Sequence, residues 1–441
     1  MMKVKHIIFS LIIISTFYSG SAQVRYTLKD CIGIGLERNF SILIARNNQT
    51  ISGNNYTIGN AGYLPAITLG SLYNGTVTNF TQNNDPGGKT TVNGSVTNSA
   101  NASVNLNWTI FSGFNVSTTY KKLNELRQVG ELNTQITVEN YISSIVSVYY
   151  NYIQQVELVN NLKYAVTLSK ERLRIDEQRY LLGSNSKLQV LQSRVYLNAD
   201  SSLLSQQTEA LKATQIRLNE LMAVDDMSGQ FVLTDTIINV QPDLLFEKLL
   251  DETLRLNTSL KIASKNKTIS QYDYKLIVSR TYPYLTLSSG YSLGMNNYST
   301  GGIKSDNSNG VNYGLTLGVN LFNGFNNRRE IKNASIDIKN MELQYAQVEQ
   351  GIKADLITIY SAYRNNLRLI NLEEQNFETA TENLSIAMDR YKLGNLAGID
   401  LRDVQKSFLD ARESLLTIQY QAKLAEISLL VISGHVMEYF R

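Results

Sequence analysis

The chain has 441 residues, of which 41 are Lys or Arg and 38 are Asp or Glu, so its formal net charge at pH 7 is only +3. This near balance gives no general attraction for a polyanion and argues against nucleic acid as a partner. With one Cys and two His, the chain has no internal disulfide and no cluster at metal-ligand spacing, so we expect no metal, no cofactor and no enzyme active site built on these residues.

Residues 1–22 have the pattern of an export signal. Lys3 and Lys5 supply a positive start, residues 7–17 are apolar, and the small residues at 20–22 form a cleavage site. We therefore expect the mature protein to be sent across a membrane. No run of 18 apolar residues follows the signal, which predicts that the mature chain has no membrane-spanning helix.

The first mature segment, residues 27–62, is predicted to be helical because Leu28, Ile32 and Leu36 recur along one stripe. Cys31 lies on this segment, too far beyond the apolar run of the signal to be a lipid-modified cleavage cysteine. We expect it to be a small buried thiol.

After Pro65 the apolar period changes to two, which is typical of β-strands. The first predicted β-hairpin spans 66–111, with strands at 66–77 and 101–110 around an exposed loop at 78–100 that is rich in Asn, Thr, Gly and Ser. The second spans 284–322, with strands at 285–295 and 311–321.

One face of these four strands is apolar, and the other consists of Asn, Thr, Ser and Gly without charges. This pattern is typical of a surface that meets lipid on one side and water on the other. The alternative is a soluble β-sandwich, but the wet face of a sandwich usually carries Lys or Glu. The composition therefore favours membrane strands.

A long segment without Pro follows each hairpin, at 114–182 and at 325–393. Apolar residues recur three and four apart in both, so each is predicted to be one helix of about 100 Å. Such a helix must pack along others as a coiled-coil-like rod. A second apolar-periodic run follows each, which gives two long helical hairpins at 114–223 and 325–433.

The chain is a tandem duplication. The phrase Arg179-Tyr180-Leu181-Leu182-Gly183 returns 211 residues later as Arg390-Tyr391-Lys392-Leu393-Gly394, and the same offset aligns about a hundred residues. We place the first repeat at 23–241 and the second at 242–441. Gly183 and Gly394 are the predicted turns at the tips of the two helical hairpins.

Four strands cannot close a membrane barrel, because single-chain barrels need at least eight and lipid does not tolerate open sheet edges. The barrel must therefore be shared between chains. Three chains supply 12 strands and a wet lumen, and their helical hairpins continue the tube. The predicted fold class is mixed α and β: a trimeric 12-stranded membrane β-barrel continued by an α-helical barrel. This architecture predicts a channel.

The order of helix, β-hairpin, long helix, Tyr-x-x-Gly turn and returning helix resembles the TolC-type outer membrane efflux proteins over residues 27–434. The resemblance implies a homotrimer in the lipid of a Gram-negative outer membrane, with the helical barrel in the periplasm. It also implies a periplasmic adaptor protein and an inner membrane pump as partners. The adaptor is expected to contact the hairpin tips at Gly183 and Gly394, with Arg179 and Arg390 beside them.

The same resemblance implies a periplasmic gate. Its expected residues are Asp400 and Asp403, which line the narrow opening, and Tyr391, which helps to hold it closed. Some family members carry an Arg two residues after the second turn Gly, but this position is Leu396 here, so other links are expected to hold the closed state. The first repeat has Gln at both acidic positions. The alternative is that the two Asp residues are a solvated helix face.

Two other functions stay open at this stage. A structural coiled coil in the periplasm explains the helices but leaves the alternating strands unexplained. An outer membrane channel for type I protein secretion explains every feature as well as an efflux channel does, because the family serves both kinds of export.

Overall fold

The computed structural model describes residues 24–84 and 87–439. The predicted signal at 1–22 and Pro86 lie outside the described residues. The chain forms two compact units, a helical unit of residues up to 47, 134–260 and 348 onward, and a sheet unit of residues 48–133 and 261–347. Each unit therefore contains segments from both sequence repeats.

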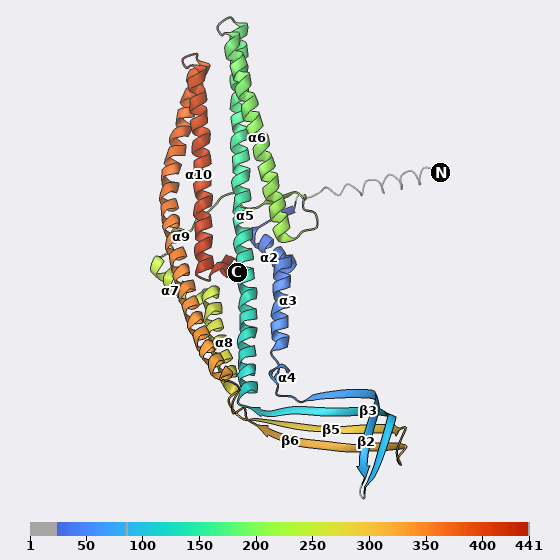
Figure 1. Ribbon diagram of the computed structural model, residues 1–441. Helices are drawn as coiled ribbons and strands as arrows, with labels where there is room; N and C mark the ends of the chain where they lie inside the picture. The colour runs from blue at the N-terminus through green and yellow to red at the C-terminus, as the bar shows by residue number, and fades with distance from the viewer. Residues whose placement is uncertain (1–23, 85–86, 440–441) are drawn as a thin grey trace, which may run out of the picture. The chain divides into compact units, whose positions relative to one another are not determined.

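The helices account for most of the described chain, and Figure 1 shows the two long hairpins α5–α6 and α9–α10. The helices are α2 (Leu28–Arg38), α3 (Phe40–Asn55), α4 (Ile58–Ala61), α5 (Asn115–Leu181), α6 (Lys187–Met222), α7 (Phe246–Leu256), α8 (Thr258–Ser279), α9 (Asn326–Lys392) and α10 (Gly398–Ile432), with a final 3-10 turn η1 (Val436–Tyr439).

The segment 27–62 is helical, as predicted, and consists of three helices. Asn39 ends α2 in an extended conformation, and its side-chain Oδ1 accepts a hydrogen bond from the N–H of Ser41 at the start of α3. Its Nδ2 donates to the carbonyl of Leu221 at 3.2 Å. Asn257 does the same between α7 and α8 of the second repeat, with Nδ2 donating to the carbonyl of Ile432 at 2.9 Å. A side chain that bonds neighbouring backbone groups in this way competes with helix continuation.

The core of the helical unit lies where α2, α5 and α6 pack together. Tyr149, Ile142 and Leu218 are fully buried there. Gly35 of α2 lies so close to the Tyr141 ring that a Cβ at this position would overlap the Tyr hydroxyl. Cys31 is buried as expected, and burial raises the pKa of its thiol to about 12.

Among the described helices, α10 is the one that is long and apolar enough to cross a membrane by length and composition. The sequence pattern predicted none. Half of its apolar stretch is buried against the rest of the protein, including Leu415, Ile427 and Leu429. A helix that is apolar on most sides is typical of a position inside a core, and burial explains the composition of α10.

The sheet unit contains one antiparallel sheet in the order β2-β3-β5-β6 (Figure 1). Its strands are β2 (Ala66–Asn84), β3 (Gly88–Ser112), β5 (Tyr284–Tyr298) and β6 (Ser305–Gly318). The predicted exposed loop at 78–100 is wrong, because β2 continues to Asn84 and β3 starts at Gly88. Strand β6 in turn starts before the predicted residue 311 and ends before 321. In the helical unit, the short strands β1 (Val24–Tyr26) and β4 (Phe231–Leu233) pair in parallel.

The strand register sorts the side chains of the sheet into two faces. Leu69, Val104, Tyr291 and Val311 are partners across all four strands, and each is between 44% and 81% exposed in the single chain. The neighbouring row, on the opposite face, consists of Thr68, Asn105, Gly290 and Asn312. Because side chains alternate along a strand, the register gives the sheet an apolar face and a polar face, and the polar face carries Asp306 opposite Asn296 near one end.

The repeated Phe-x-Gly-Phe sequence makes the corner between a strand and a long helix. Gly113 and Phe114 both have positive φ angles, of 62° and 67°, and Gly324 and Phe325 repeat this with 67° and 62°. In both corners the two Phe rings meet edge to face, with centroids 5.3 Å and 5.1 Å apart. The two repeats therefore enter their long helices by the same backbone path.

Candidate functional site: the tips of the helical hairpins

Both helical hairpins turn through the same hydrogen-bonded motif. The N–H of Gly183 donates to the carbonyl of Tyr180 at 3.0 Å, and the N–H of Ser184 donates to the carbonyl of Arg179 at 2.9 Å. The second hairpin repeats both bonds at the same lengths around Gly394. The φ angles of the two Gly residues are 75° and 83°, in the left-handed region that Gly adopts without strain. The repeated five-residue phrase is therefore the sequence of a Schellman-type helix end.

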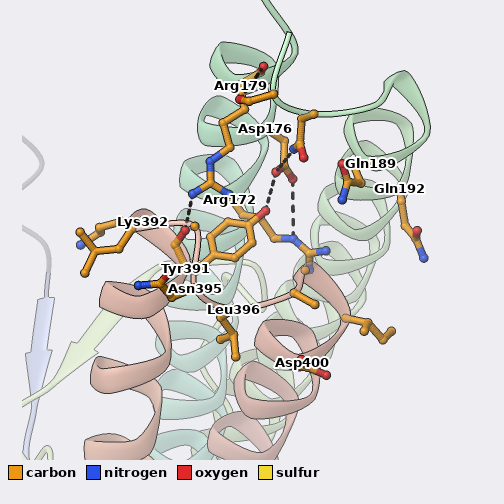
Figure 2. Close-up of a pocket in the computed structure, with 17 residues that line it drawn as sticks. Arg172, Asp176, Arg179, Gln189, Gln192, Tyr391, Lys392, Asn395, Leu396 and Asp400 are labelled. Carbon is orange, nitrogen blue, oxygen red and sulfur yellow. Dashed lines mark hydrogen bonds and ion pairs between the residues drawn. The ribbon is translucent and has the colours of Figure 1, made fainter. Parts of the chain in front are cut away.

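The carboxylate of Asp176 on α5 is the centre of a hydrogen-bond network at the tips (Figure 2). It accepts hydrogen bonds from the hydroxyl of Tyr391 on α9, from Nδ2 of Asn185 at 3.0 Å and from the hydroxyl of Ser193 on α6. Nε of Arg172 lies 4.0 Å from its Oδ2. Asp176 is buried, and a buried charge is stabilised by partners of this kind.

Tyr391 is held from two sides. Its hydroxyl donates to Asp176, and its backbone carbonyl accepts a hydrogen bond from Nη2 of Arg179, whose Cζ lies 5.0 Å from the centre of the Tyr ring. Burial, and then the hydrogen bond to Asp176, raise the pKa of Tyr391 to about 12. The Tyr hydroxyl therefore remains a donor at neutral pH, and the network ties the tip of the second hairpin to that of the first.

A cleft of about 920 Å³ lies between the two turns and is lined by residues of both hairpins (Figure 2). Behind the network, an apolar cluster holds the hairpins together. Its buried members are Leu168, Ile175, Leu384, Ala387, Met388, Tyr391, Leu401 and Phe408. Leu396, at the position where some family members carry Arg, packs against this cluster. Within the described residues, no group of three His, Cys, Asp or Glu is placed to hold a metal ion.

The two predicted gate acids lie outside the Asp176 network. Asp400 is exposed in the first turn of α10, and Asp403 is exposed one turn further along. The equivalent residues of the first repeat have local partners, since Gln189 exchanges capping hydrogen bonds with Ser186 and Gln192 donates to the Tyr196 hydroxyl at 3.1 Å. The structure thus places Tyr391 against Asp176, a buried acid of the first repeat, and leaves Asp400 and Asp403 exposed to solvent.

The residues that were predicted to contact the adaptor lie in different environments. Gly183 and Gly394 form the turns, Arg179 is committed to Tyr391, and Arg390 is exposed on α9. Apolar side chains surround the turns, and Leu181 and Leu182 are each 82% exposed.

Asp176 and Arg172 were not among the site residues predicted from the sequence. One signal could have identified Asp176, because the residue 211 positions later is Ala387. An acid that appears in only one copy of a buried repeat position indicates a partner specific to that copy.

The comparisons with known proteins agree with this architecture. The family model described as "Outer membrane efflux protein" matches residues 32–224 and 249–435. No curated protein sequence matches the chain. Among solved structures, the CmeC outer membrane channel of Campylobacter jejuni is similar with a TM-score of 0.77 and 16% identity, over 92% of this chain and 85% of that one.

Two further structures are similar over nearly the whole chain. The outer membrane protein VceC of Vibrio cholerae gives a TM-score of 0.74 and 15% identity, over 92% of this chain and 96% of that one. The open state of the MtrE outer membrane channel of Neisseria gonorrhoeae gives a TM-score of 0.67 and 17% identity, over 93% of this chain and 89% of that one. These likenesses show the shared fold, and the family model matches most of the sequence in two segments. The chain therefore belongs to the outer membrane efflux protein family.

Proposed function

We propose that three copies of this chain form one channel through the Gram-negative outer membrane, which is the exit duct of a tripartite efflux system. The observation that carries the proposal is the sheet of four strands with one apolar face, one polar face and two outer edges, at β2 and β6. The apolar side chains of this sheet are exposed in the single chain, and a contiguous exposed apolar surface marks a contact with lipid or with a partner. With lipid on the apolar face and water on the polar face, each face of the sheet meets a solvent that suits its side chains.

The two outer edges support a closed assembly of several chains. Unpaired N–H and C=O groups are not tolerated in lipid, so β2 of one copy has to pair with β6 of the next. Three sheets of this kind give 12 strands, and the polar row of Thr68, Asn105, Gly290 and Asn312 lines the lumen. The helical hairpins then continue the tube into the periplasm.

At the hairpin tips, we infer a contact with a periplasmic adaptor that couples the duct to an inner membrane pump. The exposed leucines around Gly183 and Gly394 support this inference, because solvent-exposed apolar groups at a helix end suit a protein partner. Arg390 is a further candidate, since its side chain is exposed beside the second turn.

The periplasmic opening is the proposed gate. Asp400 and Asp403 of three copies place six carboxylates around one constriction, which attracts cations and disfavours anions. The closed state is held by Tyr391 through Asp176 and Arg179. These links replace the contact that Leu396 cannot make.

Fractionation of the native membranes tests the assembly. The expected result is a heat-resistant trimer in the outer membrane fraction that conducts ions in planar bilayers. A soluble monomer contradicts the proposal.

Deletion of the gene separates efflux from type I protein secretion. Accumulation of small toxic compounds in the deletion strain supports efflux. Loss of a secreted protein with unchanged compound accumulation supports type I secretion instead.

A further inference from the structure

A second charged contact joins the two helical hairpins below the Tyr391 network. Arg402 on α10 donates two hydrogen bonds to the carboxylate of Asp200 on α6, from Nη1 to Oδ2 and from Nη2 to Oδ1, both at 2.8 Å. The Asp side chain is 2% exposed and the Arg side chain 18%. Paired bonds between a guanidinium and a carboxylate combine strength with a fixed geometry.

The surroundings fix both partners of this pair. The hydroxyl of Ser169 on α5 donates to Oδ2 of Asp200. The ring of Tyr196 lies close to two guanidinium groups, with its centre 5.1 Å from Cζ of Arg402 and 4.9 Å from Cζ of Arg172. The pair therefore connects three helices, α5, α6 and α10, from both hairpins.

Arg402 lies in sequence between Asp400 and Asp403, on a different face of α10. Successive helix residues are about 100° apart, so Arg402 can bind Asp200 while both acids remain exposed. The turn of α10 that carries the two acids is thus fastened to the first hairpin. It cannot move away from α6 unless the two hydrogen bonds break.

The contact between α10 and α6 is an ion pair, although apolar residues lie nearby on α10. On either side of Arg402 in α10, Leu401 and Phe408 are buried in the apolar cluster of the tips. A buried ion pair adds little net stability compared with apolar packing, but it specifies one arrangement, and the loss of one partner leaves an unpaired buried charge. These properties suit a contact that selects between two arrangements of the hairpins.

We propose that the Asp200–Arg402 pair is a second latch between the hairpins, which positions the turn of α10 bearing Asp400 and Asp403 and has to release before the channel opens. The proposal rests on the proposed function. Arg402 and Asp200 are positioning residues: they act on the opening through the helix turn and do not line it.

Planar bilayer conductance of the purified trimer tests the latch. Arg402→Ala and Asp200→Asn are each expected to raise the open probability roughly 10- to 100-fold, a range that corresponds to the loss of about one hydrogen bond to a charged group. The double variant is expected to open the channel no more than the single ones do, because all three remove the same contact and only the single variants leave an unpaired buried charge. Arg402→Lys keeps the charge without the paired geometry and is expected to lie between wild type and Arg402→Ala.

The matched control is Arg217→Ala, which removes an exposed ion pair to Glu220 within α6 and leaves the link between the hairpins intact. Arg402→Met keeps the packed volume, so it serves where Arg402→Ala fails to assemble, and it is expected to open the channel as well. Variant trimers that assemble normally and conduct like wild type overturn the latch. A wild-type protein that forms no conducting trimer overturns the proposed function itself.

Discussion

The hydroxyl of Tyr391 donates a hydrogen bond to the carboxylate of Asp176, which lies 215 residues earlier on the other hairpin. The 211-residue offset pairs Asp176 with Ala387, which has no carboxylate, so the contact has no counterpart in the other direction. Tyr180, which the 211-residue offset pairs with Tyr391, is 45% exposed. The duplication therefore supplied two similar turns, and later substitutions made one of them bind the other.

Replacement of Tyr391 by Phe is expected to weaken the closed arrangement of the tips. It removes a hydrogen bond to a charged group, which is worth about 2 kcal/mol. We expect a lower thermal transition of the trimer and a larger conductance in planar bilayers. Tyr180→Phe is the matched control, because it removes the same atom from the equivalent, half-exposed position. Equal effects of the two variants contradict a specific role for Tyr391.

The contribution of Tyr391 is expected to depend on pH in the alkaline range. Its pKa is raised to about 12 by burial and by the bond to Asp176, from an unfolded value of about 10. A group whose pKa is raised on folding stabilises the folded state fully below the unfolded pKa and loses this effect as pH rises through the folded pKa. The difference in melting temperature between wild type and Tyr391→Phe should stay constant from pH 8 to about 10 and then shrink towards pH 12. A difference that is already lost at pH 9 contradicts the assignment.

The architecture was predictable from sequence where local rules and tertiary context agree. The Gly turns follow from the left-handed conformation that a helix end requires. The faces of the sheet follow from period-two alternation. Tertiary context overrode composition in one place. Residues 78–100 are rich in turn-forming types, but in a sheet whose polar face consists mainly of Asn, Thr, Ser and Gly the same types fill the strands, and Val77 pairs with Val96.

The charged contacts of the tips could not be derived from spacing. Asp200 and Arg402 come together only because the fold brings α6 and α10 within hydrogen-bonding distance at this point. The internal repeat holds a partial signal, because the 211-residue offset pairs Asp200 with Ala411 and Leu191 with Arg402. Polar residues that replace apolar ones in a single repeat indicate where the two copies have become different, but the partner has to be found in the fold.

The two faces of the sheet are expected to respond differently to the same charge. Leu69 and Thr68 are neighbours in β2 on opposite faces. Leu69→Arg places a charge on the proposed lipid face and is expected to cost about 2–4 kcal/mol near the middle of the bilayer. Thr68→Arg places it in the proposed lumen, where water remains. Outer membrane trimers should be lost in the first variant and kept in the second, and a soluble trimer in both contradicts the membrane assignment.

Asp400 and Asp403 are expected to determine ion selectivity. Replacement of both by Asn removes six charges from the proposed trimer and should lower the cation preference, measured as the reversal potential in a salt gradient. Asp410→Asn is the control, because this acid is exposed on the same helix two turns further from the tip. If Asp410→Asn lowers the cation preference as much as the double variant does, the selectivity comes from general surface charge and not from a gate. Unchanged selectivity in the double variant leaves Asp400 with a structural role at the N-terminus of α10.

The two strand-to-helix corners provide a paired test of packing. Gly113 and Gly324 have positive φ angles of 62° and 67°, so Ala at either position is expected to cost about 1–2 kcal/mol of backbone strain. A Cβ at Gly113 would also lie 2.3 Å from the carbonyl oxygen of Ser279, whereas the nearest atom at Gly324 is Nδ2 of Asn326 at 3.7 Å. Overpacking against a backbone atom costs a further ~1–3 kcal/mol. Gly113→Ala should therefore lower the melting temperature clearly more than Gly324→Ala does, and equal losses would mean that the backbone of Ser279 moves aside at little cost.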